Sequence, residues 1–186
     1  MSTRIEPLLT IDDLDAMPDD GNHYEIIEGE LLVSRAPSLI HQVIVKNFIA
    51  YIQRYLDQNP IGFVVPGPGV IFSDFSGVIP DIVFITNERR SEIAFGERIT
   101  GAPDLVIEVV SPGPENEKRD RIAKRQLYGK YGVKEYWVVD PYKRTIEVYL
   151  LKAQTLKLRA TYTEQDDLVS SELAGFTCKV RTIFQF

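Results

Sequence analysis

The stretch Gly101–Pro112 constrains the fold more than any other part of the chain. Residues Asp104–Val110 are almost entirely aliphatic and β-branched, between Pro103 and turn residues that start at Ser111. An apolar run of this length between turn signals predicts a strand covered on both faces. One carboxylate, Glu108, interrupts it, and a lone buried carboxylate is costly unless it is paired, protonated or bound to a metal. Glu108 is therefore either a hydrogen-bonded structural group or part of a site.

Length and composition suit one globular domain that spans residues 1–186. The chain is 44% apolar and 26% charged, and no apolar run reaches the length of a membrane span. The first residues lack the pattern of a secretory signal. Cys178 is the sole cysteine, which excludes an internal disulfide and a cysteine-based zinc cluster. We therefore expect a cytoplasmic protein with no membrane partner.

Charge is distributed unevenly along the chain. The net charge is −6, which argues against a protein that coats nucleic acid through bulk charge. Residues 117–134, however, hold seven basic and two acidic side chains, so this basic segment carries +5 and the remainder carries −11. The basic segment is either a solvated helix face or a surface whose exposed members meet a phosphate backbone.

Hydrophobic periodicity and turn signals predict the elements of the first half. Thr10 and Asp13 have the spacing of a capping box, which predicts a short helix to about Met17. The further elements expected are a hairpin at Tyr24–Val33 that turns at Glu28-Gly29, a long helix at Pro37–Gln58 capped by Ser38, strands at Ile61–Val65, Gly69–Phe72 and Pro80–Thr86, and a helix around Arg90–Phe95. In the hairpin, Glu25 lies on the first strand and Glu30 on the second, where Glu30 is expected to face solvent.

The second half contains a helix with an unusual polar line. Residues Pro114–Glu117 predict a loop, and Asp120–Tyr131 predicts a helix on which Asp120, Lys124 and Tyr128 share one side at four-residue spacing. That line runs beside an apolar one, at the edge of the face expected to be buried. The remaining elements expected are a strand at Val133–Val139 that contains Tyr136-Trp137, a hairpin of Thr145–Leu151 with Thr155–Tyr162, and a tail at Leu168–Phe186.

Asp81 is the acidic residue best placed to meet Glu108. It opens the strand predicted at Pro80–Thr86, 27 positions before Glu108, which leaves room for a connection and a neighbouring strand. Asp104 also follows a proline, but at ~3.3 Å per residue it lies about 13 Å from Glu108 along the same strand. One metal ion cannot bind both Asp104 and Glu108, whereas strand pairing can bring Asp81 close.

Two carboxylates that converge from neighbouring strands, with a cation opposite, suit a hard divalent ion. Such an ion lowers the pKa of a bound water and offsets the charge of a phosphoryl group. Lys124 is the natural cation, because its helix follows the Glu108 strand through a short loop and can pack back on the sheet. A lysine there can stabilise the transition state or orient the attacking water.

These residues resemble the PD-(D/E)XK nuclease superfamily, whose core carries an Asp and a Glu-x-Lys on adjacent strands. Here Pro80-Asp81 and Glu108-Val109-Val110 stand in that order. The closer resemblance is to a large bacterial family of uncharacterised restriction-endonuclease-like domains. Its pattern is matched by Tyr24–Gly29, Pro80-Asp81, Pro103–Pro112, the line of Asp120, Lys124 and Tyr128, and Gly132–Pro141.

The resemblance implies a fold and a metal site. The fold is of the α/β (α+β) class, a restriction-endonuclease-like mixed β-sheet flanked by helices, with an extra β-hairpin. Asp81 and Glu108 would bind Mg²⁺ or Mn²⁺, and Glu25 is the candidate for a third metal ligand from an N-terminal element. His41, on the long helix, is the weaker candidate for that third position.

The implied function is metal-dependent hydrolysis of phosphodiester bonds in DNA by a homodimer. Val110 stands at the superfamily's lysine position, and within the family that role moves to Lys124. One alternative is a module that keeps the nuclease fold with little activity and binds nucleic acid or a protein partner. Another is an interaction protein that dimerises through the Tyr136-Trp137 strand and the hairpin. Metal binding that depends on Asp81 and Glu108 distinguishes the enzyme from both.

Overall fold

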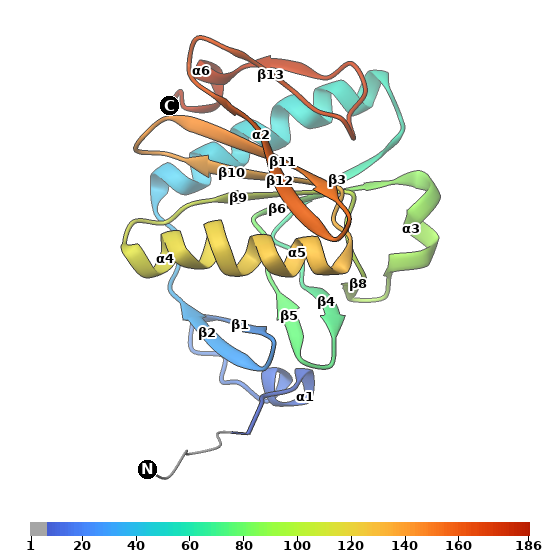
Figure 1. Ribbon diagram of the computed structural model, residues 1–186, viewed down its shortest axis with the longest axis vertical. Coiled ribbons are helices and arrows are strands. Elements are labelled where there is room, and N and C mark those ends of the chain that lie inside the picture. The colour runs from blue at the N-terminus through green and yellow to red at the C-terminus, as the bar shows by residue number, and fades with distance from the viewer. Residues whose placement is uncertain (1–6) are drawn as a thin grey trace.

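The computed structural model describes residues 7–186. The first six residues of the expected domain, and with them most of the N-terminal segment that lacks a signal pattern, lie outside the described residues. Two six-stranded sheets and a two-stranded ribbon are combined with helices (Figure 1).

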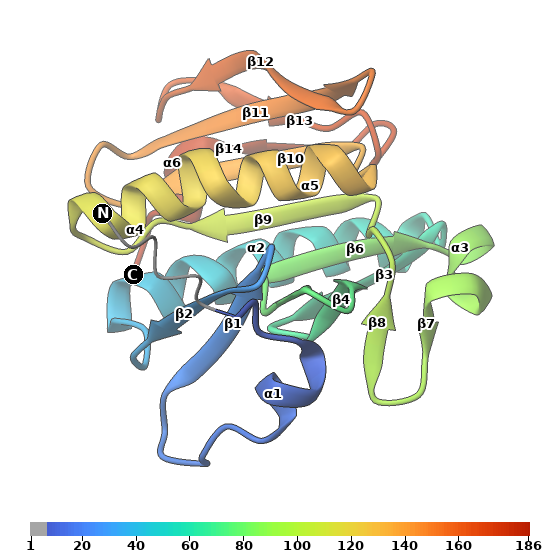
Figure 2. The ribbon, with the colours of Figure 1, turned by 60° about the horizontal axis from the view of Figure 1, so that its bottom comes forward.

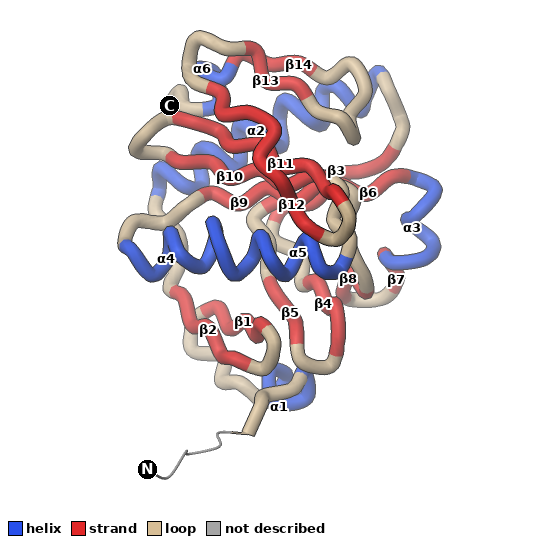
Figure 3. Tube along the Cα trace, viewed as in Figure 1, coloured by secondary structure: helices blue, strands red, loops and turns tan. Residues whose placement is uncertain are grey.

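Helices and strands follow one another in a mixed order (Figure 3). The helices are α1 Ile11–Asp15, α2 Leu39–Gln58, α3 Asn87–Ile93, α4 Pro114–Lys118, the π-helical segment η1 Arg119–Lys124, α5 Arg125–Tyr131 and α6 Val180–Ile183. The strands are β1 His23–Ile27, β2 Glu30–Ser34, β3 Gly62–Pro66, β4 Val70–Ser73, β5 Ser76–Val78, β6 Ile82–Thr86, β7 Ala94–Phe95, β8 Arg98–Thr100, β9 Leu105–Val109, β10 Glu135–Asp140, β11 Thr145–Lys152, β12 Thr155–Tyr162, β13 Asp167–Val169 and β14 Thr177–Lys179.

Glu108 lies on the central strand β9 of the sheet with the order β12-β11-β10-β9-β6-β3. We call it the larger sheet because its strands have five to eight residues, whereas those of the other sheet have two to five. Strand β9 pairs in parallel with β10 and antiparallel with β6, so both of its edges are occupied. All five of its residues are buried. This burial on both faces confirms the prediction made from its nearly continuous apolar run.

The two faces of the larger sheet are covered by different helices. Ile107 and Val109 belong to a buried cluster with the apolar stripe of α2, while Val106 and Val110 belong to a second cluster with side chains of α5. Figure 2 shows α2 and α5 on either side of β9. Because successive side chains of a strand alternate between faces, Glu108 points to the α5 side.

The smaller sheet, in the order β2-β1-β5-β4-β8-β7, closes over the α5 side of the larger one. Val70 and Val78 of this sheet belong to the same buried cluster as Tyr128 and Tyr136. The hairpin predicted at Tyr24–Val33 is confirmed as β1 and β2, and it joins β5 in this sheet. Residues from β1 and β5 are thereby brought to the face on which Glu108 lies.

One prediction about the second half is wrong, and one of the alternatives loses the surface that it needs. Residues 114–117 are not a loop, because Pro114 starts α4 at a first helical position, where its missing N–H has no helical partner in any case. Tyr136 and Trp137 are both fully buried within the chain, so the strand that carries them cannot serve as a surface for dimerisation. The long helix with its Ser38 cap and the C-terminal hairpin are confirmed to within two residues.

Helix α2, with 20 residues, is amphipathic. Its buried side chains form one stripe against the larger sheet, and polar residues occupy the opposite side. Neither α2 nor any other helix within residues 7–186 combines the length and the apolar character that crossing a membrane requires.

Gly129 lies where α5 passes close to the β11–β12 turn. A Cβ atom on Gly129 would stand 3.1 Å from the backbone nitrogen of Leu156 and 3.2 Å from the backbone oxygen of Gln154. We expect Gly129→Val to lower the free energy of unfolding by roughly 1–3 kcal/mol more than Gln126→Val, an exposed position on the same helix. Urea unfolding followed by circular dichroism measures both variants. An equal loss in the two would contradict the close approach.

Candidate active site

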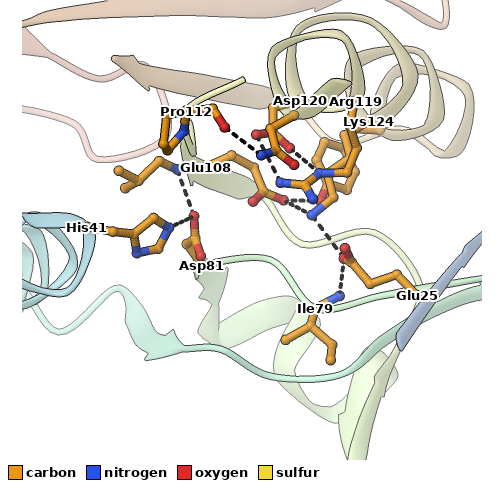
Figure 4. Close-up of polar contacts among 12 residues, drawn as sticks. Glu25, His41, Ile79, Asp81, Glu108, Pro112, Arg119, Asp120 and Lys124 are labelled. Atoms are coloured by element: carbon orange, nitrogen blue, oxygen red, sulfur yellow. Dashed lines mark hydrogen bonds and ion pairs between the residues drawn. The ribbon is translucent and has the colours of Figure 1, made fainter. Parts of the chain in front are cut away.

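Asp81 and Glu108 face each other across neighbouring strands. Asp81 stands directly before β6, and β6 pairs antiparallel with β9 so that Ile82 lies opposite Ile107. The same register, continued by one residue, sets Asp81 opposite Glu108. The structure thus brings together the two carboxylates that the sequence singled out (Figure 4).

Asp81 is held by two donors on one of its oxygens. Its Oδ2 accepts a 2.7 Å hydrogen bond from the backbone nitrogen of Val109 and lies 3.1 Å from Nε2 of His41 on α2. A carboxylate only accepts, so Nε2 is the donating nitrogen of His41. Nδ1 of His41 is the one buried side-chain nitrogen or oxygen in residues 7–186 that has no hydrogen-bond partner. His41 thus reaches the site as a neighbour of Asp81.

Glu108 also shares one oxygen between two donors. Its Oε1 accepts hydrogen bonds from Nζ of Lys124 at 3.0 Å and from the hydroxyl of Tyr128 at 2.6 Å. All three side chains are buried. The four-residue spacing of Lys124 and Tyr128 in the sequence therefore places both of them on Glu108.

Lys124 connects Glu108 to the smaller sheet. Its Nζ lies 2.9 Å from Oε1 of Glu25, and that oxygen also accepts a 2.7 Å hydrogen bond from the backbone nitrogen of Ile79. Glu25 lies on β1 and is only 4% exposed. The structure thus brings Glu25 to the site as a partner of Lys124. Glu30, on β2, is exposed, as predicted.

The segment that carries Lys124 is a π-helix, which the sequence periodicity did not predict. Both Asp120 and Lys124 are buried on it, so the polar line faces inward instead of lying at the edge of the buried face. Single π-helical turns within α-helices occur frequently at functional sites. Here the π-helix presents two charged side chains to the same interior space.

Arg119 is a second cation at the site, and the sequence placed it only within the basic segment. Its guanidinium contacts both carboxylate oxygens of the buried Asp120, at 2.8 and 3.2 Å. Figure 4 shows the guanidinium near Glu108 and Lys124. Adjacency to Asp120 in the matched pattern was the one available signal for Arg119, because no periodicity separates it from the other basic residues.

Electrostatics at the site are dominated by burial and by closely spaced carboxylates. Burial raises the pKa of Glu108 to about 8; Lys124 opposes this rise, whereas Asp81, Asp120 and Glu25 reinforce it. Burial by itself would lower the pKa of Lys124, but Glu108 and Glu25 outweigh that effect and raise it, so the amine stays protonated. Four acidic side chains, Glu25, Asp81, Glu108 and Asp120, thus lie near the two cations Lys124 and Arg119. This excess of acids favours the binding of a further cation.

These side chains line one cavity of about 340 Å³ between the two sheets. Its lining includes Glu25, Asp81, Glu108, Arg119 and Lys124. A cavity of this size, with a few convergent polar groups and a carboxyl of perturbed pKa, has the properties expected of an active site.

Most basic side chains of the basic segment form ion pairs with acidic side chains of the same chain. Five of its seven basic residues make ion pairs, namely Arg119 with Asp120, Arg121 with Asp140 and Glu147, Lys124 with Glu25 and Glu108, Lys130 with Glu28, and Lys134 with Asp104. Arg125 lies over the ring of Tyr149. Most of the positive charge of the basic segment is therefore paired within the chain, while Lys118, Lys130 and Lys134 stay exposed. Its contact with a phosphate backbone stays a prediction.

Asp104, the competing acid, lies just before β9, at the end away from Glu108. Its carboxylate is fully buried and is held by Thr86, Arg89 and Lys134. The positive neighbours and the backbone hydrogen bond outweigh burial and lower the pKa of Asp104. Asp104 is a structural group outside the cavity.

The cavity and the sheets around it lie within a segment that matches a known family. The model of the Uma2 family, described as "Putative restriction endonuclease", matches residues 11–181. The chain belongs to the Uma2 family. This membership confirms the resemblance drawn from the residues around Asp81 and Glu108.

One solved structure is similar to this Uma2 chain over nearly its whole length. It is the crystal structure of a "putative nuclease belonging to DUF820" from Anabaena variabilis, with a TM-score of 0.76 and 22% sequence identity. The similarity covers 95% of this chain and 97% of that chain. It confirms the restriction-endonuclease-like fold with a mixed sheet flanked by helices. No curated protein matches the Uma2 chain.

The carboxylates of this Uma2 site fit a hard divalent ion that keeps other ligands. Asp81 Oδ1 and Glu108 Oε2 accept no hydrogen bond from the described residues, so each has free lone pairs. No group of three or more His, Cys, Asp or Glu side chains in residues 7–186 is arranged to hold a metal. Mg²⁺ is commonly held by one or two carboxylates together with water and a substrate phosphate. Asp81 and Glu108 can provide the two carboxylates. The role of Glu25 as a third ligand stays a prediction.

The raised pKa of Glu108 makes stability depend on pH. Between its ordinary pKa of 4.5 and about 8, the folded carboxyl binds a proton that the unfolded chain releases. The contribution of Glu108 to stability is therefore full at low pH and falls as pH rises through this window. Each pKa unit corresponds to about 1.4 kcal/mol. In metal-free buffer we expect the wild type to lose roughly 1–4 kcal/mol more than Glu108→Gln across this window. Urea unfolding at several pH values measures this, with exposed Glu30→Gln as control; parallel curves for all three proteins would contradict it.

Lys124 compensates two buried carboxylates, so its loss leaves both without their cation. We expect Lys124→Met, which keeps the length of the side chain, to lower the free energy of unfolding at neutral pH by about 3 kcal/mol. Exposed Lys118→Met, in the preceding turn, should change it by under about 0.5 kcal/mol. Chemical unfolding of both variants decides the matter, and similar stability would show that Glu25 and Glu108 do not depend on Lys124.

Proposed function

We propose that this chain is a metal-dependent endonuclease that hydrolyses phosphodiester bonds of DNA, with Mg²⁺ or Mn²⁺ bound by Asp81 and Glu108. The observation that carries the proposal is the meeting of Asp81, Glu108 and Lys124 in one cavity, in a chain of the Uma2 family. The family description "Putative restriction endonuclease" and the fold shared with the "putative nuclease belonging to DUF820" support the same reaction class.

The reaction would need the chain to position a water and a phosphate next to each other. The water oxygen forms a bond to phosphorus, the bond from phosphorus to the leaving oxygen breaks, and a proton from the water ends on the leaving oxygen. A bound divalent ion makes the water more acidic and offsets charge on the phosphate. Lys124, protonated and 3.0 Å from Glu108, supplies a fixed positive charge beside the phosphate.

The supporting contacts orient each group for this task. Val109 and His41 both occupy Oδ2 of Asp81, which fixes the carboxylate and leaves Oδ1 for the metal. Val110 is 4% exposed and lies on the same strand face as Glu108, two residues on. A lysine at position 110 would approach Glu108 from the strand, and in this chain Lys124 approaches it from the helix instead.

A catalytically weak module that keeps the nuclease fold is the second candidate. The observation that favours it is the pairing of Lys124 with both Glu25 and Glu108, which satisfies the lysine without any substrate. Such a module would bind nucleic acid or a protein partner without depending on Asp81 and Glu108.

Metal binding and DNA cleavage test the proposal together. We expect the wild type to bind Mg²⁺ or Mn²⁺ in calorimetric titration and to nick supercoiled plasmid, and EDTA to abolish nicking. Asp81→Asn and Glu108→Gln should lose metal binding and reduce the nicking rate by roughly 100-fold or more. Lys124→Met should keep measurable metal binding and lose a similar factor in rate.

The matched control is Glu30→Gln, which changes an exposed acid on β2. It should bind metal and nick DNA like the wild type. If the wild type binds no metal at millimolar concentration, or if Asp81→Asn and Glu108→Gln nick DNA at the wild-type rate, the proposed enzyme is wrong. DNA binding that survives both substitutions without cleavage would favour the module.

A further inference from the structure

A second cavity, of about 430 Å³, lies beside the candidate active site. It is enclosed by α1 and the residues that follow it, together with β1, β4 and β5 of the smaller sheet. Figure 1 shows α1 beside β1 and the turn that joins β4 to β5. Asp81, Glu108 and Lys124, the residues of the proposed reaction, line only the first cavity.

The two cavities meet at a common rim. His23, Gly67 and Ile79 line both of them. Ile79 is also the residue whose backbone nitrogen holds Glu25 in the first cavity, as Figure 4 shows. A ligand bound at Glu108 can therefore extend directly into the second cavity.

The cavities open on opposite faces of the smaller sheet. Glu25 lines the first cavity and Tyr24, its neighbour on β1, lines the second. Adjacent residues of a strand point to opposite faces. The second face is the one covered by α1, because a Cβ atom on Gly77 would meet the side chain of Ile11. A ligand that occupies both cavities must pass over the shared rim at His23, Gly67 and Ile79.

The lining of the second cavity suits a nucleobase better than a phosphate. Arg98, its single permanent cation, is paired with Asp15, and Asp19 adds a negative charge. Tyr24 contributes a half-buried ring whose hydroxyl is fixed by a 2.8 Å hydrogen bond to Asp20. Aromatic rings stack on bases of any sequence, and carboxylates accept hydrogen bonds from base amino groups.

We infer that the second cavity binds the unpaired base next to the cleaved phosphate, so that the substrate is single-stranded nucleic acid. This inference rests on the proposed nuclease function of the first cavity. The carboxylate of Glu108 is buried, so the phosphate must enter the first cavity to reach it. A base within a duplex is paired and stacked and must be flipped out before it can enter a cavity, whereas the base of a single strand is free to enter.

The test compares cleavage, by the full chain with Mg²⁺ or Mn²⁺, of a single-stranded DNA oligonucleotide and of the duplex of the same sequence. We expect the single strand to be cut at least roughly 10-fold faster, because no base pair has to open. Tyr24→Ala should raise KM for the single strand by about 5-fold or more while kcat stays near the wild-type value. Tyr24→Phe keeps the ring and should behave like the wild type.

The control is Tyr142→Ala, which changes a tyrosine that is 61% exposed and lines neither cavity. If thermal melting shows that Tyr24→Ala does not fold, Asn22→Trp fills the mouth of the cavity from an exposed position and should raise KM in the same way. Equal rates on the duplex, or an unchanged KM in the folded variants, would overturn the inference and leave the nuclease function standing.

A wild type that cleaves neither substrate would refute the proposed function separately. Fluorescence anisotropy of the labelled single strand then decides the inference by itself. Weaker binding in Tyr24→Ala or Asn22→Trp, with Tyr142→Ala unchanged, would support the base-binding cavity. Identical binding by all four proteins would overturn it.

Discussion

The rest of this structure depends on the two ion pairs that the ammonium group of Lys124 makes. It lies between Glu108 of the larger sheet and Glu25 of the smaller one, and all three side chains are buried. Removing a charge from water costs several kcal/mol, and two buried carboxyl groups cannot both ionise at neutral pH without a cation close to them. Lys124 therefore decides both how the sheets meet and which charges the cavity retains.

The three central charged residues of the candidate active site could be predicted from the sequence, because the position of each follows a simple rule. Glu108 interrupts an apolar strand, Asp81 opens the next strand in the sheet, and Lys124 lies on the helix that returns to the same face. Alternation in strands and four-residue spacing in helices are local properties of the backbone, so the sequence reveals them directly. The sequence did not show whether Glu25 is buried, because either side of a strand of five residues can face the core.

The smaller sheet and the π-helix could not be predicted, for a different reason. Strands β5, β7 and β8 have two or three residues each, too few for a periodic pattern. Their partners lie far away in the sequence, as Ile26 with Gly77 shows. The π-helical turn leaves no mark on composition, and so the inward direction of Asp120 and the position of Arg119 required the structure.

The charge balance of the molecule gives the metal a second role. The net charge is −6, and five of the seven basic side chains of the basic segment form ion pairs within the chain. The basic segment thus offers a polyanion little unpaired positive charge, and the carboxylates of the first cavity would repel a phosphate that entered alone. A divalent ion between Asp81 and Glu108 would remove that repulsion where the phosphate binds. In such a protein, affinity for nucleic acid and catalysis would depend on the same ion, so that one is not expected without the other.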